Sequence, residues 1–387
     1  MEWSGRQVQI TWTTVGEVAA GAVVKHSNES NMVREAVLKT ALDPETPGID
    51  IQKACTTGIE AVITIANKIA QGQIEAGIAG GVDSMSNLPI GISDKYRKAL
   101  LKANSAKSFI EKIKIFSALS LKDLKPVPYR GQEPETGLTM GEHTELTAAY
   151  YGITRQQQDE LALKSHLNLT KAYDEGFYDD IVTPFAGLSQ DNTLRRDTSM
   201  EKLGKLKPAF PKTGQTMTAG NSTNFTDGAS GILLASEEWA AKHNLPVLAY
   251  VTYAETGAIE YVRNQHNLLL APVIVAPRML EKANLKLQDF DFYEIHEAFA
   301  AQVLATLKIW GDDELSRQFG LPGALGKIDM ERLNVAGSSL ATGHPFAATG
   351  GKVVSTLAKL LYMKGSGRGL ISVCAARGQG STMILER

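Results

Sequence analysis

The strongest constraint on the fold is a pattern in which short apolar strands alternate with helices at glycine-marked turns. The sequence predicts strands at 15–24, 49–54 and 76–80, and between the last two a helix at 56–71 whose apolar residues recur at three- and four-residue steps. Strands joined by a helical crossover run parallel. The first 85 residues therefore predict one α/β half built around a parallel sheet.

The end of the chain repeats this arrangement. Strands are predicted at 333–335 and 369–373, and between them a Gly/Ser-rich turn carries His344 into a helix at 348–361. A reactive side chain opens the helix of each unit, Cys55 in the first and His344 in the last. The shared layout predicts an internal duplication, with a second α/β half at 244–387.

The middle of the chain differs from both halves. Residues 86–208 are polar, rich in lysine and mostly helical in pattern, which predicts a helical loop domain, and 209–243 then complete the first half. Within the loop domain, 105–125 combines an apolar face containing Phe109, Ile113 and Phe116 with several lysines. That composition is typical of helices that lie on membranes, and packing on the same domain or on a partner subunit is the alternative.

Composition excludes several classes of protein. The net charge of −2 is not that of a nucleic-acid-binding protein. Two cysteines are too few for a disulfide scaffold or a four-cysteine zinc site, and no metal or resident cofactor is expected. Met1–Thr14 lacks the features of a signal peptide. We therefore expect a cytoplasmic protein if the source is bacterial and a mitochondrial-matrix protein if it is eukaryotic.

Four side chains are candidates for chemistry because each lies at a predicted strand end or helix start. Cys55 at a helix N-terminus is expected to have a lowered pKa, and its N–H can stabilise an oxyanion; a buried small hydrophobe is the alternative. His344, between Gly343 and Pro345, suits a base or hydrogen-bond donor, or else a structural role. His296 and Cys374 complete a set at the edge where open α/β sheets bind ligands.

Six ordered motifs carry a resemblance to a known family. They are Cys55-Thr-Thr-Gly, Gly80 to Ser86, Asn221 to Ala229, His296-Glu-Ala-Phe-Ala, Gly343-His344-Pro345 and Cys374, and together they resemble the thiolases. The resemblance implies a duplicated α-β-α-β-α fold with a helical loop domain. His296, where most thiolases carry Asn, and the segment at 113–124 with Pro126-Val-Pro resemble the β subunit of the fatty-acid-oxidation trifunctional enzyme.

The resemblance implies a 3-ketoacyl-CoA thiolase of fatty-acid β-oxidation. Cys55 would form the acyl-enzyme, His344 would activate it, and Cys374 would serve as acid and base. His344 with His296, or with a water that His296 holds, would serve the enolate oxygen, and the N–H groups of Cys55 and Ala376 would serve the acyl intermediate. The alternatives are a biosynthetic acetoacetyl-CoA thiolase and an inactive acyl-CoA-binding homologue.

The family also implies how substrate and partners are held. Coenzyme A would enter as a substrate, with Arg195 at its nucleotide end, Thr223 near the pantetheine and Met140 lining the acyl end. The expected assembly is a homodimer, joined in the trifunctional case to a hydratase/dehydrogenase subunit.

Three features depart from the family pattern. The family's opening strand and helix are not recognisable in Met1–Thr14, so they are expected to be missing. Arg377 and Ser338 each stand where the family has glycine. If the turn at Arg377 needs a positive φ, a side chain there is expected to cost about 1–3 kcal/mol and to obstruct the Cys374 thiol.

Overall fold

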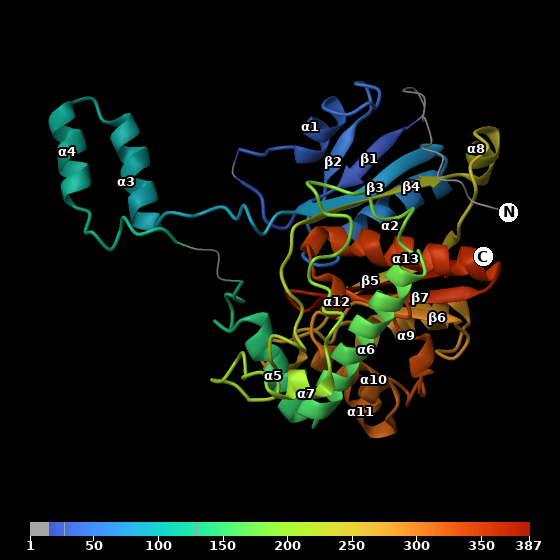
Figure 1. Ribbon diagram of the computed structural model, residues 1–387. Coiled ribbons are helices and arrows are strands. Elements are labelled where there is room, and N and C mark those ends of the chain that lie inside the picture. The colour runs from blue at the N-terminus through green and yellow to red at the C-terminus, as the bar shows by residue number, and fades with distance from the viewer. Residues whose placement is uncertain (1–14, 27, 128–130) are drawn as a thin grey trace.

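The computed structural model describes residues 15–26, 28–127 and 131–387, and within them the strands form two mixed sheets (Figure 1). The first sheet has the order β2-β1-β3-β4 and comprises β1 (Glu17–Ala20), β2 (Gly48–Asp50), β3 (Ala76–Asp83) and β4 (Gly228–Ala235). β1 runs parallel to β2 and β3, as predicted, and β4 is antiparallel to β3. The predicted Met1–Thr14 departure lies outside the described residues.

The second sheet has the order β5-β8-β7-β6. It comprises β5 (Tyr250–Ala258), β6 (Phe292–Ile295), β7 (Arg368–Ala375) and β8 (Gln379–Glu386). β6 is parallel to β7, whereas β8 is antiparallel to both of its neighbours. Each sheet therefore contains parallel strands and an antiparallel return, which makes the chain a mixed α/β protein.

Two helices, α2 (Thr57–Ala70) and α13 (Thr349–Lys364), lie between the sheets (Figure 1). One core joins Ile59 of α2, Leu357 of α13 and Ile371 of β7. Because side chains alternate across a strand, Ala19 of β1 faces this core whereas its neighbour Val18 faces the other side of the sheet.

Helices also cover the outer faces of both sheets. α1 (Met32–Leu38) packs on the first sheet around Val18, and α9 (Pro272–Ala283) packs on β5 and β8 of the second. The layers thus follow the expected α-β-α-β-α order. The other body helices are α5 (Met140–Tyr150), α6 (Arg155–Asp174), α7 (Met200–Gly204), α8 (Glu237–Lys242), α10 (Ala300–Trp310), α11 (Asp313–Gln318), α12 (Ser339–Thr342), η1 (Gln265–Asn267), η2 (Met330–Arg332) and η3 (Phe346–Ala348).

Two predicted strands are wrong in part, and side-chain hydrogen bonds explain both. Of the strand predicted at 49–54 only β2 forms, because the chain then turns, with Ala54 at φ 47° and the Thr57 hydroxyl accepting from the Lys53 N–H. The strand predicted at 333–335 is a single bridge from Leu333 to Tyr293, because the Asn334 side chain takes both backbone groups of Ile295.

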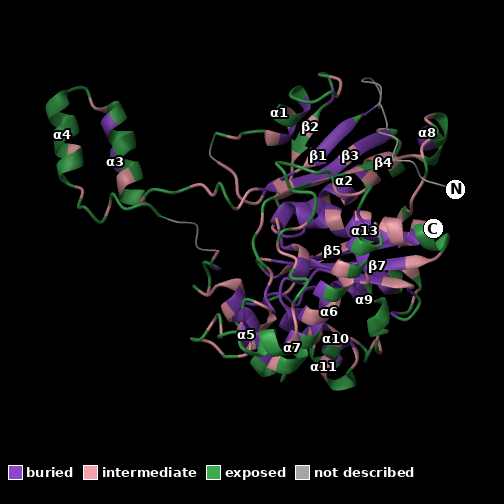
Figure 2. Cartoon of the chain, in the orientation of Figure 1, coloured by how far each residue is buried: buried purple, intermediate pink, exposed green. Residues whose placement is uncertain are grey.

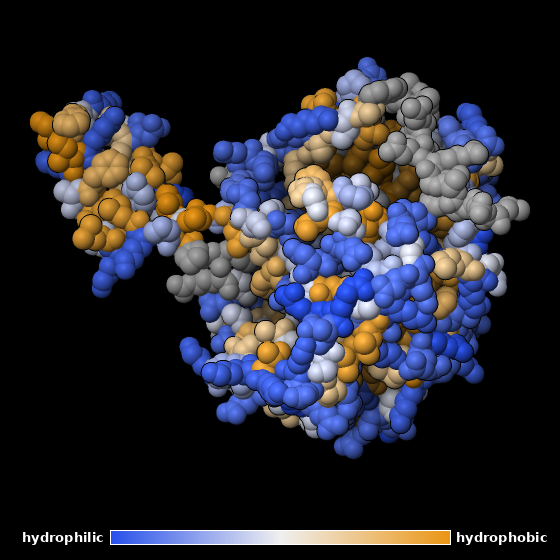
Figure 3. Space-filling model, in the orientation of Figure 1, coloured by the Kyte–Doolittle hydropathy of each residue, from blue (hydrophilic) through white to orange (hydrophobic). Residues whose placement is uncertain are grey.

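A helical hairpin, α3 (Asp94–Ser105) with α4 (Phe109–Ser117), stands away from the body (Figure 1). The two arms that lead to it pair through Gly91 and Val127. None of the residues of α4 is buried, and Figure 2 shows the hairpin almost wholly exposed. Its surface mixes apolar and charged side chains (Figure 3), with Phe109 77% exposed and Ile113 52% exposed. In the described part of the chain, no helix is both long and apolar enough to cross a membrane.

Candidate active site

Three of the four side chains that were candidates for chemistry converge at one buried point. Cys55 lies two residues before the start of α2, His296 directly follows β6, and His344 lies just before η3 and α13. The Cys55 sulfur and one nitrogen of each imidazole all lie within 4.8 Å of one another. The three side chains are at most 5% exposed. One thiol and two imidazoles at this spacing can transfer a proton, and they can also ligate a metal.

Cys55 is brought to the histidines by a close contact between the two central helices. A Cβ at Gly58 would lie 2.6 Å from the Ala347 carbonyl oxygen, so only glycine lets the first turn of α2 approach η3 this closely. The Thr57 hydroxyl holds the turn before the helix by donating to the Ala54 carbonyl at 2.7 Å. The Cys55-Thr-Thr-Gly motif therefore supplies the thiol and also permits the close helix packing that positions it.

His344 is fixed from three directions. Its N–H donates to the Asn224 carbonyl at 2.8 Å, and its Nδ1 shares a 2.6 Å hydrogen bond with the Thr349 hydroxyl. The buried Asp83 carboxylate accepts from the Ala347 N–H at 2.8 Å and from the N–H groups of Val23 and Val24. Asp83, at the end of β3, thus ties the His344 turn of one half to the first sheet of the other.

His296 is held by the second sheet and by the segment before His344. Its N–H donates to the Ser372 carbonyl at 2.9 Å, and its Nδ1 shares a 2.8 Å hydrogen bond with the Ser339 hydroxyl. The His296 and His344 rings lie 4.2 Å apart, centre to centre. The neighbouring Glu297 carboxylate accepts from the Leu340 N–H, which fixes the segment that carries Ser339.

Burial controls the charge of the site. It raises the pKa of the Cys55 thiol to about 12, although the N–H groups of Ala376 and Cys55 favour the thiolate. The lowered pKa predicted from the helix N-terminus is therefore wrong for the unliganded protein, because desolvation outweighs these N–H groups. Burial likewise lowers the pKa of His344 to about 3 and that of His296 well below its ordinary value. The resting site is neutral.

Cys374 lies on β7 and is 1% exposed. Burial raises the pKa of its thiol well above the ordinary value, and the nearby Cys55 raises it further. Ala376, just beyond the strand, presents its N–H toward Cys55. The structure thus brings the second thiol and the predicted oxyanion N–H to the neighbourhood of the first thiol.

Arg377, in the turn after Cys374, lies at φ 64°, so the condition under which a side chain at this position is costly is met. Its guanidinium is half exposed and pairs with Glu135 at 3.0 Å and with Glu133 at 3.4 Å. The Tyr261 hydroxyl donates to the same two carboxylates. Ser338, the other glycine replacement, has φ −137°, an extended conformation that any residue adopts.

The three predicted substrate-binding residues lie at different distances from this point. The Thr223 hydroxyl donates to the Ser339 carbonyl at 2.7 Å, beside His296. Met140 begins α5 and packs on the cluster that contains Cys374. Arg195 is exposed, and its N–H donates to His166 of α6 at 3.2 Å, so its side chain does not join the thiol–imidazole group.

Sequence reasoning missed the residues that orient the histidines. Ser339 and Thr349 each bind one imidazole Nδ1, and Asp83 fixes the His344 turn. Thr349 follows His344 by five residues, but Ser339 and Asp83 are brought to the site only by the fold. In the sequence, the one signal for such an orienting residue was a hydroxyl side chain a few positions from a candidate histidine.

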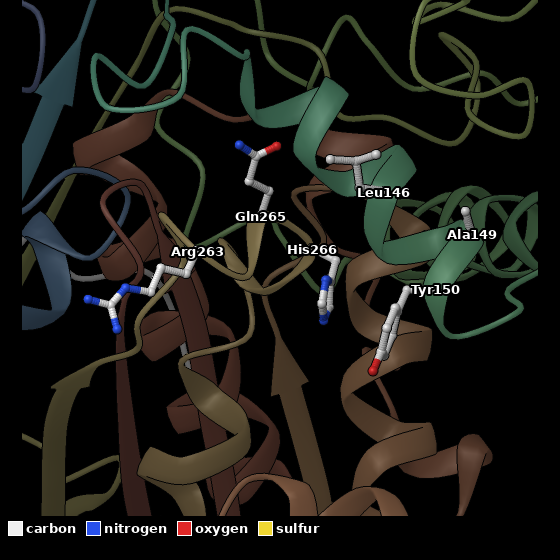
Figure 4. A pocket seen from close by; sticks show the side chains of 6 residues that line it. All are labelled: Leu146, Ala149, Tyr150, Arg263, Gln265 and His266. Atoms are coloured by element: carbon white, nitrogen blue, oxygen red, sulfur yellow. The ribbon is translucent and has the colours of Figure 1, made fainter.

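A hollow on the surface, shown in Figure 4, contains none of the predicted site residues. It lies between α5 and the segment before α9, and the stacked rings of Tyr150 and His266, 3.8 Å apart, form one wall. Arg263 and Gln265 line the opposite side. The buried thiol–imidazole group is thus separate from this hollow.

Comparison with known proteins identifies a family. Residues 6–238 match the model described as "Thiolase, N-terminal domain", and residues 246–387 match "Thiolase, C-terminal domain". A 3-ketoacyl-CoA thiolase from Pectobacterium carotovorum is 41% identical over 373 residues, covering 95% of this chain and 85% of its own length. One from Serratia proteamaculans is 39% identical over 379 residues, covering 96% and 86%.

Solved structures show the same architecture. The acetyl-CoA acetyltransferase of Bacillus anthracis superposes with a TM-score of 0.79 at 29% identity, covering 97% of this chain and 88% of its own. Human mitochondrial 3-ketoacyl-CoA thiolase in complex with CoA also superposes with a TM-score of 0.79, at 26% identity, covering 98% and 88%. The fold alone does not distinguish between these two activities.

Proposed function

The chain belongs to the thiolase family, and we propose that it is a 3-ketoacyl-CoA thiolase of fatty-acid β-oxidation. It cleaves 3-ketoacyl-CoA with CoA to acetyl-CoA and an acyl-CoA shortened by two carbons. The observation that carries the proposal is the buried convergence of Cys55, His296 and His344 within 4.8 Å. The identity of 41% to a 3-ketoacyl-CoA thiolase supports the degradative activity over a biosynthetic one.

In the first half of the reaction Cys55 is the nucleophile. Its thiol proton passes to His344 Nε2, which is buried and has no hydrogen-bond partner among the described residues. The sulfur bonds to the 3-keto carbon, the carbon–carbon bond breaks, and its electron pair becomes the enolate of acetyl-CoA. Because both groups are neutral at rest, the ionic pair forms only as negative charge moves onto the substrate.

In the second half Cys374 moves the protons. Its S–H protonates the enolate carbon to release acetyl-CoA, and the resulting thiolate removes the proton from incoming CoA. The CoA sulfur then attacks the acyl-enzyme, and Cys55 leaves and recovers its proton from His344. A neutral thiol is the form that the first step requires, and burial of Cys374 maintains it.

Developing negative charge on oxygen needs fixed hydrogen-bond donors. We assign the acyl intermediate to the N–H groups of Cys55 and Ala376, both of which favour negative charge at the Cys55 sulfur. The enolate oxygen is assigned to His296 and His344, whose rings lie 4.2 Å apart, centre to centre, and whose Nε2 atoms are buried without a partner among the described residues. Their Nδ1 bonds to Ser339 and Thr349 hold both rings in place for this task.

Coenzyme A is bound as a substrate. We assign Met140 to the acyl end, which its packing on the Cys374 cluster supports, and Thr223 to the pantetheine, which its hydrogen bond to the Ser339 carbonyl beside His296 supports. Arg195 is exposed, which suits contact with the nucleotide phosphates. The domain division proposed is a first half at 1–85 completed by 209–243, a loop domain at 86–208 and a second half at 244–387.

The hairpin supports a narrower assignment to the β subunit of the trifunctional enzyme. Its exposed face contains Phe109, Ile113 and Phe116, and lysines flank it. Such a face suits either the surface of a membrane or a hydratase/dehydrogenase subunit. The proposed assembly is a homodimer, with the hairpin as its peripheral membrane contact.

Thiolysis across chain lengths tests the activity. The full chain is assayed with CoA and 3-ketoacyl-CoA substrates from acetoacetyl-CoA to long chains, with Cys55→Ala as the control. Loss of at least about 10³-fold in kcat/KM is expected for Cys55→Ala, together with an acyl adduct that mass spectrometry finds on the wild type alone. Activity confined to acetoacetyl-CoA would favour the biosynthetic alternative, and wild-type turnover equal to that of Cys55→Ala would leave an inactive homologue.

A further inference from the structure

We propose that Cys55, His296 and His344 form a binding site for a thiophilic divalent cation, of which Zn²⁺ is the type, and that the bound cation blocks the Cys55 thiol. The site goes beyond the proposed thiolase activity, which needs no metal. Only the inhibitory consequence rests on that activity. The ligand set follows from the geometry of three buried side chains.

The spacing of the three ligand atoms is close to that of a zinc site. They all lie within 4.8 Å of one another. Tetrahedral zinc, with bonds of about 2.3 Å to sulfur and about 2.0 Å to nitrogen, places neighbouring ligands roughly 3.3–3.7 Å apart. Small side-chain rotations would close the difference. One thiolate and two imidazoles also leave a fourth position for water.

Each imidazole has one nitrogen without a hydrogen-bond partner among the described residues. His296 Nε2 and His344 Nε2 are buried, and neither has a hydrogen-bond partner within residues 15–26, 28–127 and 131–387. Each Nδ1 is instead bonded to a hydroxyl, that of Ser339 or that of Thr349. Protein metal sites use this same outer bond to fix an imidazole with its other nitrogen on the metal. An unpartnered buried nitrogen is costly, so a ligand that bonds to both Nε2 atoms is favoured.

The electrostatic surroundings also favour a cation. Asp83 and Glu133 lie close enough to Cys55 to disfavour its thiolate in the metal-free protein. Binding of Zn²⁺ reverses that relation, because the two carboxylates then face a net positive centre. On binding, the sulfur–hydrogen bond is replaced by a sulfur–zinc bond and the proton leaves to solvent.

His296 makes this site a property of chains with histidine at that position. Asparagine, the residue that most thiolases carry there, offers a poor ligand for zinc, whose protein ligands are sulfur, imidazole nitrogen and carboxylate. The variant His296→Asn therefore removes one ligand and keeps a polar side chain of similar size. Ser339→Ala removes only the outer bond to His296 and leaves all three ligands in place.

The experiment measures metal binding directly, without relying on turnover. Metal-free full chain is titrated with Zn²⁺ by calorimetry and with Co²⁺ by absorption, in which a cobalt–thiolate bond gives a charge-transfer band. We expect one ion per chain for the wild type. Affinity should fall about 10-fold or more for Ser339→Ala, further for His296→Asn, and furthest for Cys55→Ala. The matched control is His243→Asn, at the end of α8.

Two results would overturn the proposal. The first is a Co²⁺ band and Zn²⁺ affinity equal in the wild type and His296→Asn, and the second is the same loss in His243→Asn. In thiolysis, Zn²⁺ should inhibit the wild type at concentrations that leave residual His296→Asn turnover unaffected. If the wild type proves inactive, the thiolase proposal fails, whereas the titrations still decide the metal site.

Discussion

The central helices and the hairpin carry similar apolar side chains in opposite environments, because those of the central helices are buried and those of the hairpin are exposed. Ile59 of α2 is fully buried where α2 meets α13, and Ile113 of α4 is 52% exposed on the hairpin. In the first region glycines such as Gly58 permit backbone contact, and Cys55 is buried there. In the second, apolar side chains are held outward on two capped helices. The buried region holds the residues to which we assign the chemistry, and the exposed hairpin is the part for which we propose a contact with another surface.

The largest contrast between the two regions is expected from shortening one isoleucine to alanine in each. Ile59→Ala creates a cavity in the core shared by both sheets and should lower the free energy of unfolding by about 2–5 kcal/mol. Ile113→Ala removes a side chain that is already hydrated and should change it by less than about 0.5 kcal/mol. Urea unfolding of both variants checks the difference, and equal losses would mean that the hairpin packs on the body.

The buried region also contains a carboxyl group whose protonation makes the stability of the protein depend on pH. Glu294 of β6 is 1% exposed, neither carboxyl oxygen has a hydrogen-bond partner in the described ranges, and burial raises its pKa to about 8. The folded protein therefore keeps this proton while the unfolded chain loses it near the ordinary pKa of about 4.3. Its contribution to stability is present below that pH and is lost as the pH rises to about 8.

Glu294→Gln should remove this pH dependence. The amide resembles the protonated acid, so the variant should match the wild type at acidic pH and exceed its stability by roughly 4–5 kcal/mol at pH 8. Thermal unfolding across this range gives the measurement, with the exposed Glu314→Gln of α11 as control. A constant difference between Glu294→Gln and wild type at all pH values would show that Glu294 does not titrate in this window.

Binding to lipid vesicles tests the proposed role of the exposed hairpin. Replacing Phe109 and Ile113 with serine should weaken sedimentation with phosphatidylglycerol vesicles by at least about 10-fold, because each apolar side chain contributes about 1.5–3 kcal/mol when buried. The thiolysis rate should not change. Wild type that stays in solution at low salt would count against the membrane contact and leave a partner subunit as the occupant of the hairpin face.

The sequence predicted the features of the fold and the site that depend on local patterns, and it did not predict those that depend on tertiary contacts. Local patterns predicted α2 within one residue at each end and the parallel strands around it, because periodicity and crossover connections are local properties. The Cys55 and His344 candidates came from their places at helix starts. The pKa of Cys55 was not predictable, since it depends on burial under segments hundreds of residues away. The roles of Ser339 and Asp83 are likewise consequences of tertiary contacts.

The smallest expected effect concerns Arg377, which follows Cys374 by three residues and pairs with Glu133 and Glu135. Its φ of 64° costs roughly 1–2 kcal/mol for a residue other than glycine. Its pairing with Glu133 and Glu135 offsets part of that strain and ties residues 131–139 to the loop after Cys374.

Arg377→Gly should therefore change the free energy of unfolding by less than about 1 kcal/mol, because the relief of strain is countered by the lost ion pair and by the greater freedom of glycine in the unfolded chain. Arg377→Asn, which tolerates the left-handed conformation, separates the two contributions: it relieves strain and also loses the ion pair, without the entropy of glycine. Urea unfolding and thiolysis of both variants are compared with the wild type. A marked rise in kcat/KM for both would mean that the Arg377 side chain obstructs the Cys374 thiol, whereas unchanged rates would show that its pairing with the two glutamates keeps it clear of the substrate.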